Sequence, residues 1–237
     1  LITSMLTVIS TNVSRKNESA RLFEISKLFI PKELPLKEQP DEKPALCIGL
    51  YGKDEDFFTL KGAVEDVFAL FGISPEYERS AEVYLHPGRQ AKAVFEGNTV
   101  AVFGEIHPEI SAKYGIDTRV YTAEISLDTL YSARKPQPVY TPLPKFPAVT
   151  RDLSLVCDRA TPAAQLEKAI RSVKSGIIED VKLFDVYEGD RISADKKSVA
   201  YSLVLRAPDR TLTDEECTDV VNKVIDALSK IGAVLRA

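Results

Sequence analysis

The chain has 237 residues, 44% hydrophobic and 28% charged, a globular composition that allows two domains with separate cores. Its longest apolar runs are interrupted by charges, so no membrane span is predicted. The formal net charge of −4 argues against a broad electrostatic grip on nucleic acid, and DNA binding is not predicted.

The first half of the chain alternates helical and strand patterns. In chain order, the predicted elements are a helix at 2–13, a strand at 20–30, a loop at 31–44, a strand at 46–51, a helix at 58–71, strands at 81–86, 91–96 and 100–104, a helix at 107–114 and a strand at 119–127. Gly72 is a suitable C-cap residue, and Gly97-Asn98 predicts a tight hairpin turn. The apolar face of the first helix is expected to seek a neighbouring chain.

A proline-rich stretch divides the sequence, with prolines at 136, 138, 142, 144 and 147. We predict a first domain at 1–135, a linker at 136–147 and a second domain at 148–237. Residues 1–138 carry 16 Lys and Arg against 20 Asp and Glu, whereas residues 139–237 carry 15 of each. A neutral second domain can still read single-stranded RNA through stacking and base edges, contributing selectivity more than affinity.

The second half follows the order β-α-β-β-α-β, which is typical of a ferredoxin-like fold. Its predicted elements are a strand at 149–157, a helix at 161–173, strands at 178–188 and 197–206, a helix at 213–230 and a strand at 232–236. Thr161-Pro162 is expected to cap the first helix, and Thr213 with Glu216 forms a capping box for the second. Both helices are expected to cover one face of the sheet and leave the other open.

Side-chain alternation assigns residues of the two middle strands to faces. On the strand at 178–188, one face is predicted to hold Val181, Leu183, Asp185 and Tyr187. On the strand at 197–206, the core face is predicted to hold Val199, Tyr201, Leu203 and Leu205. The opposite face of that second strand, which includes Ser198, is predicted to be exposed.

Four side chains on the open sheet face form the candidate site, namely Tyr187, Asp185, Ser198 and Ser154. Tyr187 can stack on a base, and Asp185 can accept hydrogen bonds from the Watson–Crick edge of guanine. The alternative is an ordinary solvated face with one exposed tyrosine.

Four motifs run through the second half: Phe146-Pro147 with Arg151-Asp152-Leu153-Ser154, and the runs 183–189, 197–201 and 210–216. In order and spacing they resemble the ferredoxin-fold anticodon-binding domain of the bacterial phenylalanyl-tRNA synthetase beta subunit. This resemblance implies that Tyr187, Asp185 and Ser198 contact the tRNA anticodon. Ser154 matches a small residue of the same family more loosely.

Three motifs in the first half, at 21–25, 56–62 and 104–109, resemble the synthetase-like core of the same subunit. That core is built like a class II aminoacyl-tRNA synthetase but is catalytically silent. The expected fold is therefore α+β, with a class II synthetase-like antiparallel sheet domain followed by a ferredoxin-like βαββαβ domain.

No catalytic residue is predicted. Arg21 and Glu24 are one residue further apart than the usual Arg-x-Glu pair of a class II site, and their odd separation predicts opposite strand faces. No Gly-rich strand ends in Glu-Arg, and His107 is predicted to start a helix rather than to act as a base.

The resemblance implies a cytoplasmic enzyme of two alpha and two beta subunits that attaches phenylalanine to tRNA(Phe) with ATP and Mg²⁺. The alpha subunit would carry the chemistry. This chain would bind no cofactor itself, would contact the alpha subunit through residues 1–135, and would supply anticodon recognition. A ferredoxin-like small-molecule regulatory module is the main alternative. A small hydrolase is a third, although no anion-cradling loop precedes the helix at 161–173.

The cysteines and histidines of the sequence indicate neither a disulfide framework nor a metal site. Cys47, Cys157 and Cys217 are far apart and odd in number, which favours a reducing compartment without a disulfide framework. The two histidines form no zinc-ligand spacing with them, so no metal site is predicted. Leu1 opens into an apolar segment without a charged n-region, so we expect a piece of a longer protein rather than a signal peptide.

Overall fold

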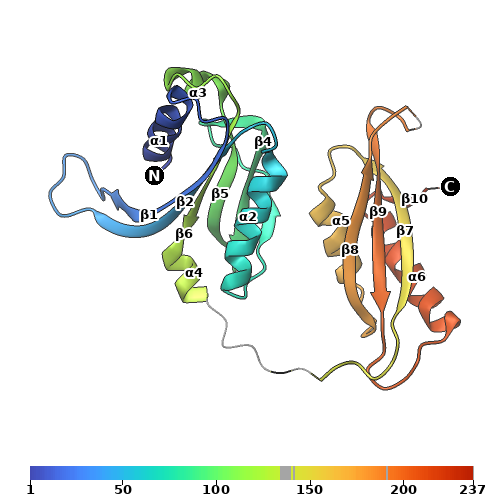
Figure 1. The fold of residues 1–237 in the computed structure, drawn as a ribbon. Coiled ribbons are helices and arrows are strands. Elements are labelled where there is room, and N and C mark those ends of the chain that lie inside the picture. Colours follow the sequence, from blue (N-terminus) through green and yellow to red (C-terminus); the bar gives the residue numbers. More distant parts are fainter. Residues whose placement is uncertain (134–139, 141, 191, 237) are drawn as a thin grey trace. The chain divides into compact units, whose positions relative to one another are not determined.

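The computed structural model describes residues 1–133, 140, 142–190 and 192–236. The chain divides into two compact units, Leu1–Pro138 and Val139–Ala237 (Figure 1). The linker predicted at 136–147 falls partly outside the described residues. Both units combine helices with antiparallel sheets, which confirms the α+β prediction.

The first unit is built on one six-stranded sheet. Its strands are β1 (Ala20–Ile30), β2 (Asp41–Tyr51), β3 (Glu76–Glu78), β4 (Leu85–Phe95), β5 (Asn98–Ile106) and β6 (Val120–Ser126). Its helices are α1 (Ile2–Ser14), α2 (Phe57–Leu70), α3 (Pro108–Lys113) and α4 (Leu127–Ala133). The strand order is β1-β2-β6-β5-β4-β3, so the long strand β1 lies at an edge.

Helices cover both faces of this sheet. On one face α1 buries Met5, Leu6 and Ile9 in a core cluster that includes Cys47. On the other face α2 and α4 pack against a second cluster that includes Phe103. Because the apolar face of α1 is covered within its own unit, the expectation that it seeks another chain is wrong.

The ends of α2 illustrate how local sequence fixes an element. The Asp56 side chain accepts a hydrogen bond from the Thr59 backbone N–H at 2.7 Å, which satisfies an orphan donor of the first turn. Gly72 follows the helix with φ of +67°, a conformation that favours glycine. The helix predicted at 58–71, stopped by Gly72, is confirmed within one residue.

The central hairpin differs from its prediction. The strands predicted at 81–86 and 91–96 are replaced by one strand, β4, whose pairing with β5 shifts register between Leu85 and Gln90. The turn lies one residue earlier than predicted, at Glu96-Gly97, because Phe95 pairs with Asn98. Both turn residues have positive φ, as a type I′ hairpin turn requires.

Other boundaries of the first unit also differ. β2 begins at Asp41 and includes Pro44, whereas a loop was predicted there. Pairing of β2 with β6 begins only at Ala45, so Pro44 has one strand neighbour, which is where a strand tolerates proline. The sequence patterns predict neither β3 nor α4.

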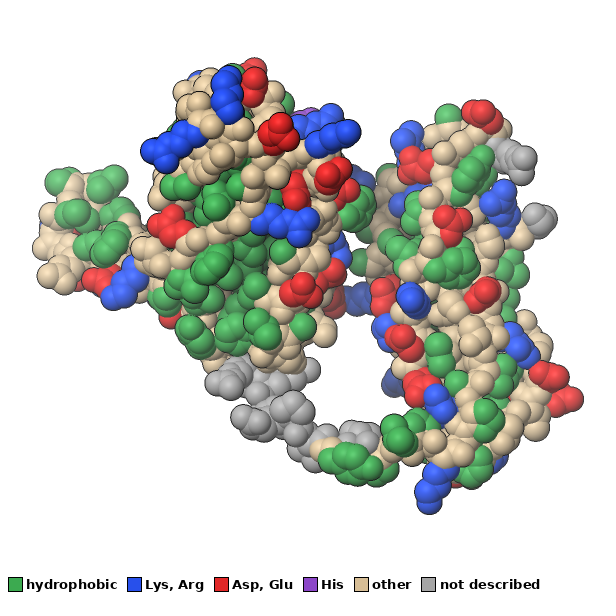
Figure 2. Space-filling model, in the orientation of Figure 1, with side chains coloured by type: hydrophobic (Ala, Val, Ile, Leu, Met, Phe, Trp, Pro, Cys, Tyr) green, Lys and Arg blue, Asp and Glu red, His purple; other side chains and the backbone are tan. Residues whose placement is uncertain are grey.

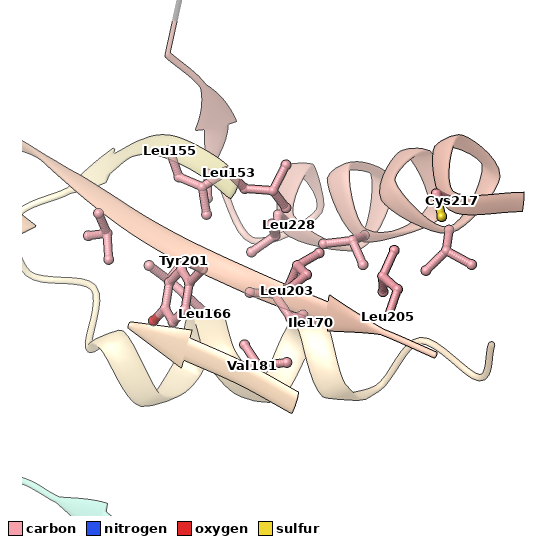
Figure 3. Packing of buried hydrophobic residues seen from close by; sticks show 14 of the residues in the cluster. Leu153, Leu155, Leu166, Ile170, Val181, Tyr201, Leu203, Leu205, Cys217 and Leu228 are labelled. Carbon is pink, nitrogen blue, oxygen red and sulfur yellow. The ribbon is translucent and has the colours of Figure 1, made fainter. Parts of the chain in front are cut away.

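The second unit has the predicted order, β7 (Val149–Asp158), α5 (Ala163–Arg171), β8 (Ile178–Tyr187), β9 (Lys196–Leu205), α6 (Asp214–Ser229) and β10 (Val234–Leu235). The strand order is β10-β7-β9-β8, which confirms the ferredoxin-like fold. Leu166 and Ile170 of α5 and Leu228 of α6 meet the same side of the sheet, around Tyr201 and Leu203 (Figure 3). One sheet face therefore holds the core, and we call the opposite face the open face.

The two helices of this unit begin differently. Thr213 accepts a hydrogen bond from the Glu216 N–H, and the Glu216 carboxylate accepts one from the Thr213 N–H, so the predicted capping box is confirmed. α5 instead has Pro162 at its N-cap and no side-chain cap. Thr161 therefore does not cap this helix as predicted.

Candidate nucleic-acid interface

A β-bulge at Phe184 determines which side chains β8 presents to the open face. Leu183 pairs with Tyr201, but the next paired residue, Asp185, is opposite Ala200, so Phe184 is an extra residue on β8. Because side chains alternate along a strand, the extra residue moves every side chain after it on β8 to the opposite face of the sheet. Leu183 faces the core side with Tyr201, and Asp185 faces the open side with Ala200. The prediction that Leu183 and Asp185 share a face is wrong.

The bulge brings the four predicted site residues together on the open face. Tyr187 lies opposite Ser198, and Ser154 lies opposite Ala200, the partner of Asp185. The Oγ atoms of Ser154 and Ser198 are 3.4 Å apart. Three adjacent strands thus contribute an aromatic ring, a carboxylate and two hydroxyls to one small area.

Exposure differs among these residues. Asp185 is exposed and Tyr187 is partly exposed, whereas Ser198 retains only 4% of its accessible surface. The prediction that Ser198 is exposed is wrong, because β9 is an inner strand and Ser198 lies between Val156 and Tyr187 of its neighbours. Ser198 therefore forms the floor of the area and Tyr187 and Asp185 form its accessible part.

The Asp185 carboxylate is available to a ligand. Among the residues that the structure describes, it has no hydrogen-bond or ion-pair partner. A free carboxylate accepts hydrogen bonds only, so it selects for a group that offers donors.

Arg236 is a member of this face that the sequence patterns do not predict. The short strand β10 pairs with β7, and the Arg236 backbone N–H donates to the Ser154 carbonyl oxygen at 2.8 Å. Its guanidinium carbon lies over the Tyr187 ring, 5.6 Å from the ring centroid, within the range of a cation–π interaction. The strand predicted at 232–236 ends on this arginine, but nothing local indicates that it pairs with β7.

The described residues of the first unit contain no comparable grouping for catalysis. The partners of Arg21 and Glu24 on β2 are Leu50 and Cys47, so the two side chains are on opposite faces of β1, as predicted. Arg21 instead forms an ion pair with Glu55 at 2.8 Å. The residues described by the structure contain no group of three or more His, Cys, Asp or Glu side chains that would suit a metal ion.

His107 has a structural role. It is the N-cap residue of α3, and its Nδ1 atom accepts a hydrogen bond from the Glu109 N–H at 3.3 Å. This confirms the predicted position at a helix start.

None of the described helices is both long and apolar enough to cross a membrane.

An apolar surface lies on the edge strand β1 and the hairpin that joins it to β2. In Figure 2 this hairpin projects at the left and carries several hydrophobic side chains in green. We call this set the hairpin apolar surface, and its exposed members are Phe23, Ile25, Phe29, Leu34 and Leu36. Phe23 retains 72% of its accessible surface, an unusual exposure for a large apolar residue beside others of its kind.

Comparison with known families covers both units. The family described as phenylalanyl tRNA synthetase beta chain CLM domain matches residues 1–127. The family described as ferredoxin-fold anticodon binding domain matches residues 144–236.

Curated relatives align along the whole chain. The phenylalanine–tRNA ligase beta subunit of Symbiobacterium thermophilum is 42% identical over 249 aligned residues, covering 100% of this chain and 28% of that protein. The beta subunit of Clostridium tetani is also 42% identical, covering 99% of this chain and 30% of its own length. That of Halalkalibacterium halodurans is 37% identical, covering 100% and 31%. The chain thus spans about three tenths of the length of these relatives.

Proposed function

Because the chain belongs to the phenylalanyl-tRNA synthetase beta chain family, we propose that it serves phenylalanine–tRNA ligase by recognising the anticodon of tRNA(Phe). The observation that carries this proposal is the β8–β9 register, which gathers Tyr187, Asp185 and Ser198 on the open face. Single-stranded RNA is typically read by such a combination of an aromatic surface and a few polar groups on a sheet.

Each side chain has a distinct role in this proposal. Tyr187 stacks on an unpaired anticodon base, and Asp185 accepts hydrogen bonds from the donors on the Watson–Crick edge of guanine. The Ser198 and Ser154 hydroxyls, which are close to each other, hold a further polar edge of the bound base. Arg236 lies over Tyr187 and supplies a positive charge for the RNA backbone.

The proposed division of labour between the units rests on two observations: the charge of the second unit, and the poor match between the described residues of the first unit and a catalytic site. The second unit has equal numbers of acidic and basic residues, so it adds selectivity while other surfaces of the assembled enzyme supply most of the affinity. The residues of the first unit do not fit an ATP–Mg²⁺ site, because Arg21 and Glu24 diverge and no metal-binding carboxylate group is present among the described residues. ATP and Mg²⁺ would be bound by the alpha subunit.

We assign subunit assembly to the first unit, as part of a cytoplasmic enzyme of two alpha and two beta subunits. The hairpin apolar surface is the candidate contact, because large exposed apolar patches mark interaction sites. Hydrogen exchange of the full beta subunit, with and without the alpha subunit, tests this. We expect added protection on β1, and no added protection in 1–135 would contradict the assignment.

A titration separates anticodon recognition from the small-molecule alternative. The chain is titrated by fluorescence with tRNA(Phe), with tRNA(Phe) altered in the anticodon, and with free amino acids. The proposal requires tighter binding of the unaltered tRNA, whereas saturable binding of an amino acid alone would favour a regulatory module.

In pyrophosphate exchange the pure chain should form no phenylalanyl-adenylate. Exchange above background would contradict the prediction that the chain alone is not catalytic.

A further inference from the structure

Gly189 lies two residues beyond Tyr187 and makes an unusually close approach to its ring. A Cβ atom added at Gly189 would be 2.6 Å from the Tyr187 Oη, 2.8 Å from Cζ and 3.3 Å from Cε2. Heavy atoms in contact normally remain about 3.5–4.0 Å apart. The tyrosine ring therefore occupies the space that any other residue at position 189 would need.

Backbone conformation does not explain the glycine. Six described glycines have positive φ, where other residues are strained, and Gly189 is not among them. Its backbone carbonyl accepts an ordinary turn hydrogen bond from the Ile192 N–H at 3.0 Å. Among the described residues, the atoms nearest to a Cβ added at this position all belong to the Tyr187 side chain.

We propose that Gly189 is a positioning residue for Tyr187, and this inference rests on the proposed role of Tyr187 in anticodon recognition. Without a side chain at 189, the ring can lie where it meets Arg236 and remains beside Ser198. A methyl group at 189 would displace the ring from that position.

The same geometry predicts that the substitution spares the fold. The clashing atoms belong to the outer end of a partly exposed side chain rather than to backbone or core, so the ring can swing away without disturbing the sheet. A Gly189→Ala change should therefore damage recognition while leaving thermal stability nearly unchanged. A purely structural glycine would show the opposite pattern.

The test uses the full beta subunit assembled with its alpha subunit. Gly189→Ala is expected to lower kcat/KM for tRNA(Phe) roughly tenfold, within the range of losing one base–aromatic stack. The unfolding midpoint of its second unit and the pyrophosphate exchange of the enzyme should match those of the unaltered enzyme. Gly62→Ala is the matched control, because a Cβ there meets nothing within 4 Å and the residue lies on α2 in the other unit.

A double-mutant comparison separates positioning from other effects. In a Tyr187→Ala background, Gly189→Ala should have no further effect, because the ring that it positions is gone. An equal loss in both backgrounds, or no loss from Gly189→Ala where Tyr187→Ala is impaired, would overturn the inference. If Tyr187→Ala itself leaves tRNA use unchanged, the proposed function fails and this inference fails with it.

Discussion

Tyr187 of β8 lies directly opposite Ser198 of β9, although counting from the Leu183–Tyr201 pair would put it opposite Lys197. The extra residue Phe184 accounts for the difference, and it turns Tyr187 from the core side to the open face. The candidate site therefore depends on a β-bulge, a local irregularity in the strand pairing. Such bulges are common next to functional sites.

Replacing Tyr187 with alanine should weaken the use of tRNA(Phe) by the assembled enzyme roughly ten- to a hundredfold. Loss of a base–aromatic stack costs about 1–3 kcal/mol, and each 1.4 kcal/mol is about a factor of ten. Aminoacylation kinetics measure the change. Phe184→Ala is the control, since Phe184 is an exposed aromatic residue of the same strand at the bulge. Equal losses in the two variants would indicate a general effect on the strand.

Asp185→Ala should reduce discrimination for guanine at the first anticodon position more than it reduces overall activity. A carboxylate pairs with the hydrogen-bond donors of guanine, and its removal leaves no group that prefers them. The measurement compares aminoacylation of tRNA(Phe) with that of tRNA altered at this base. Because Asp185 is exposed, the fold should be unaffected. An unchanged ratio between the two tRNAs would remove Asp185 from the recognition site.

Two glycines of the first sheet should respond differently to alanine. At Gly104 an added Cβ would be 2.5 Å from the Arg89 carbonyl oxygen and 2.8 Å from the Gln90 Cα, both backbone atoms that cannot move aside. At Gly49 it would meet the Met5 side chain, which can change rotamer. Overpacking typically costs about 1–3 kcal/mol, so we expect about 3 for Gly104→Ala and about 1 for Gly49→Ala by denaturant unfolding. The reverse ranking would contradict this prediction.

Alkaline pH should destabilise the first unit through Cys47. Burial raises the pKa of the Cys47 thiol to about 12, above its ordinary value of 9.0. Below pH 9 both states hold the proton and this contribution is complete. Between pH 9 and 12 the unfolded state loses the proton first, so stability falls as the pH rises.

The Cys47→Ala variant measures this contribution. From pH 8 to pH 10.5 it should lose about 2 kcal/mol less stability than the unaltered chain, at about 1.4 kcal/mol per pH unit above pH 9. The difference in unfolding free energy between the variant and the unaltered chain at pH 8 measures the cost of the packing defect alone. Burial also raises the pKa of Tyr84 to about 12, and the two largest causes, burial and the nearby Glu82 charge, are present in both proteins. Parallel pH curves would show that Cys47 does not contribute.

The elements that sequence predicts well carry their own signals. α2 has an N-cap aspartate and a terminal glycine, and α6 has a capping box, so both are predicted to within a residue or so. α4 is missed because it follows β6 directly, at Leu127, without an intervening turn residue. The predicted turn is displaced by one residue because Gly97 suits either of two adjacent turn positions.

The site is only partly predictable for a different reason. Tyr187, Asp185, Ser198 and Ser154 are indicated by family motifs, but alternation alone wrongly puts Leu183 on the same face as Asp185, since Phe184 resembles any other apolar strand residue. Arg236 and Gly189 join the site through a long-range strand pairing and a side-chain approach. Neither relationship leaves a pattern in the local sequence.

The separate cores of the two units determine how any variant of this chain must be measured. The cluster around Tyr201 and the clusters around Phe103 and Cys47 share no member. Two such cores can melt at different temperatures, so one midpoint for the whole chain is not a well-defined quantity. Calorimetry should resolve two heat-absorption peaks, with Gly104→Ala moving one and a change at Tyr201 moving the other. Each denaturation curve must therefore be read with a spectroscopic reporter confined to the unit that carries the substitution.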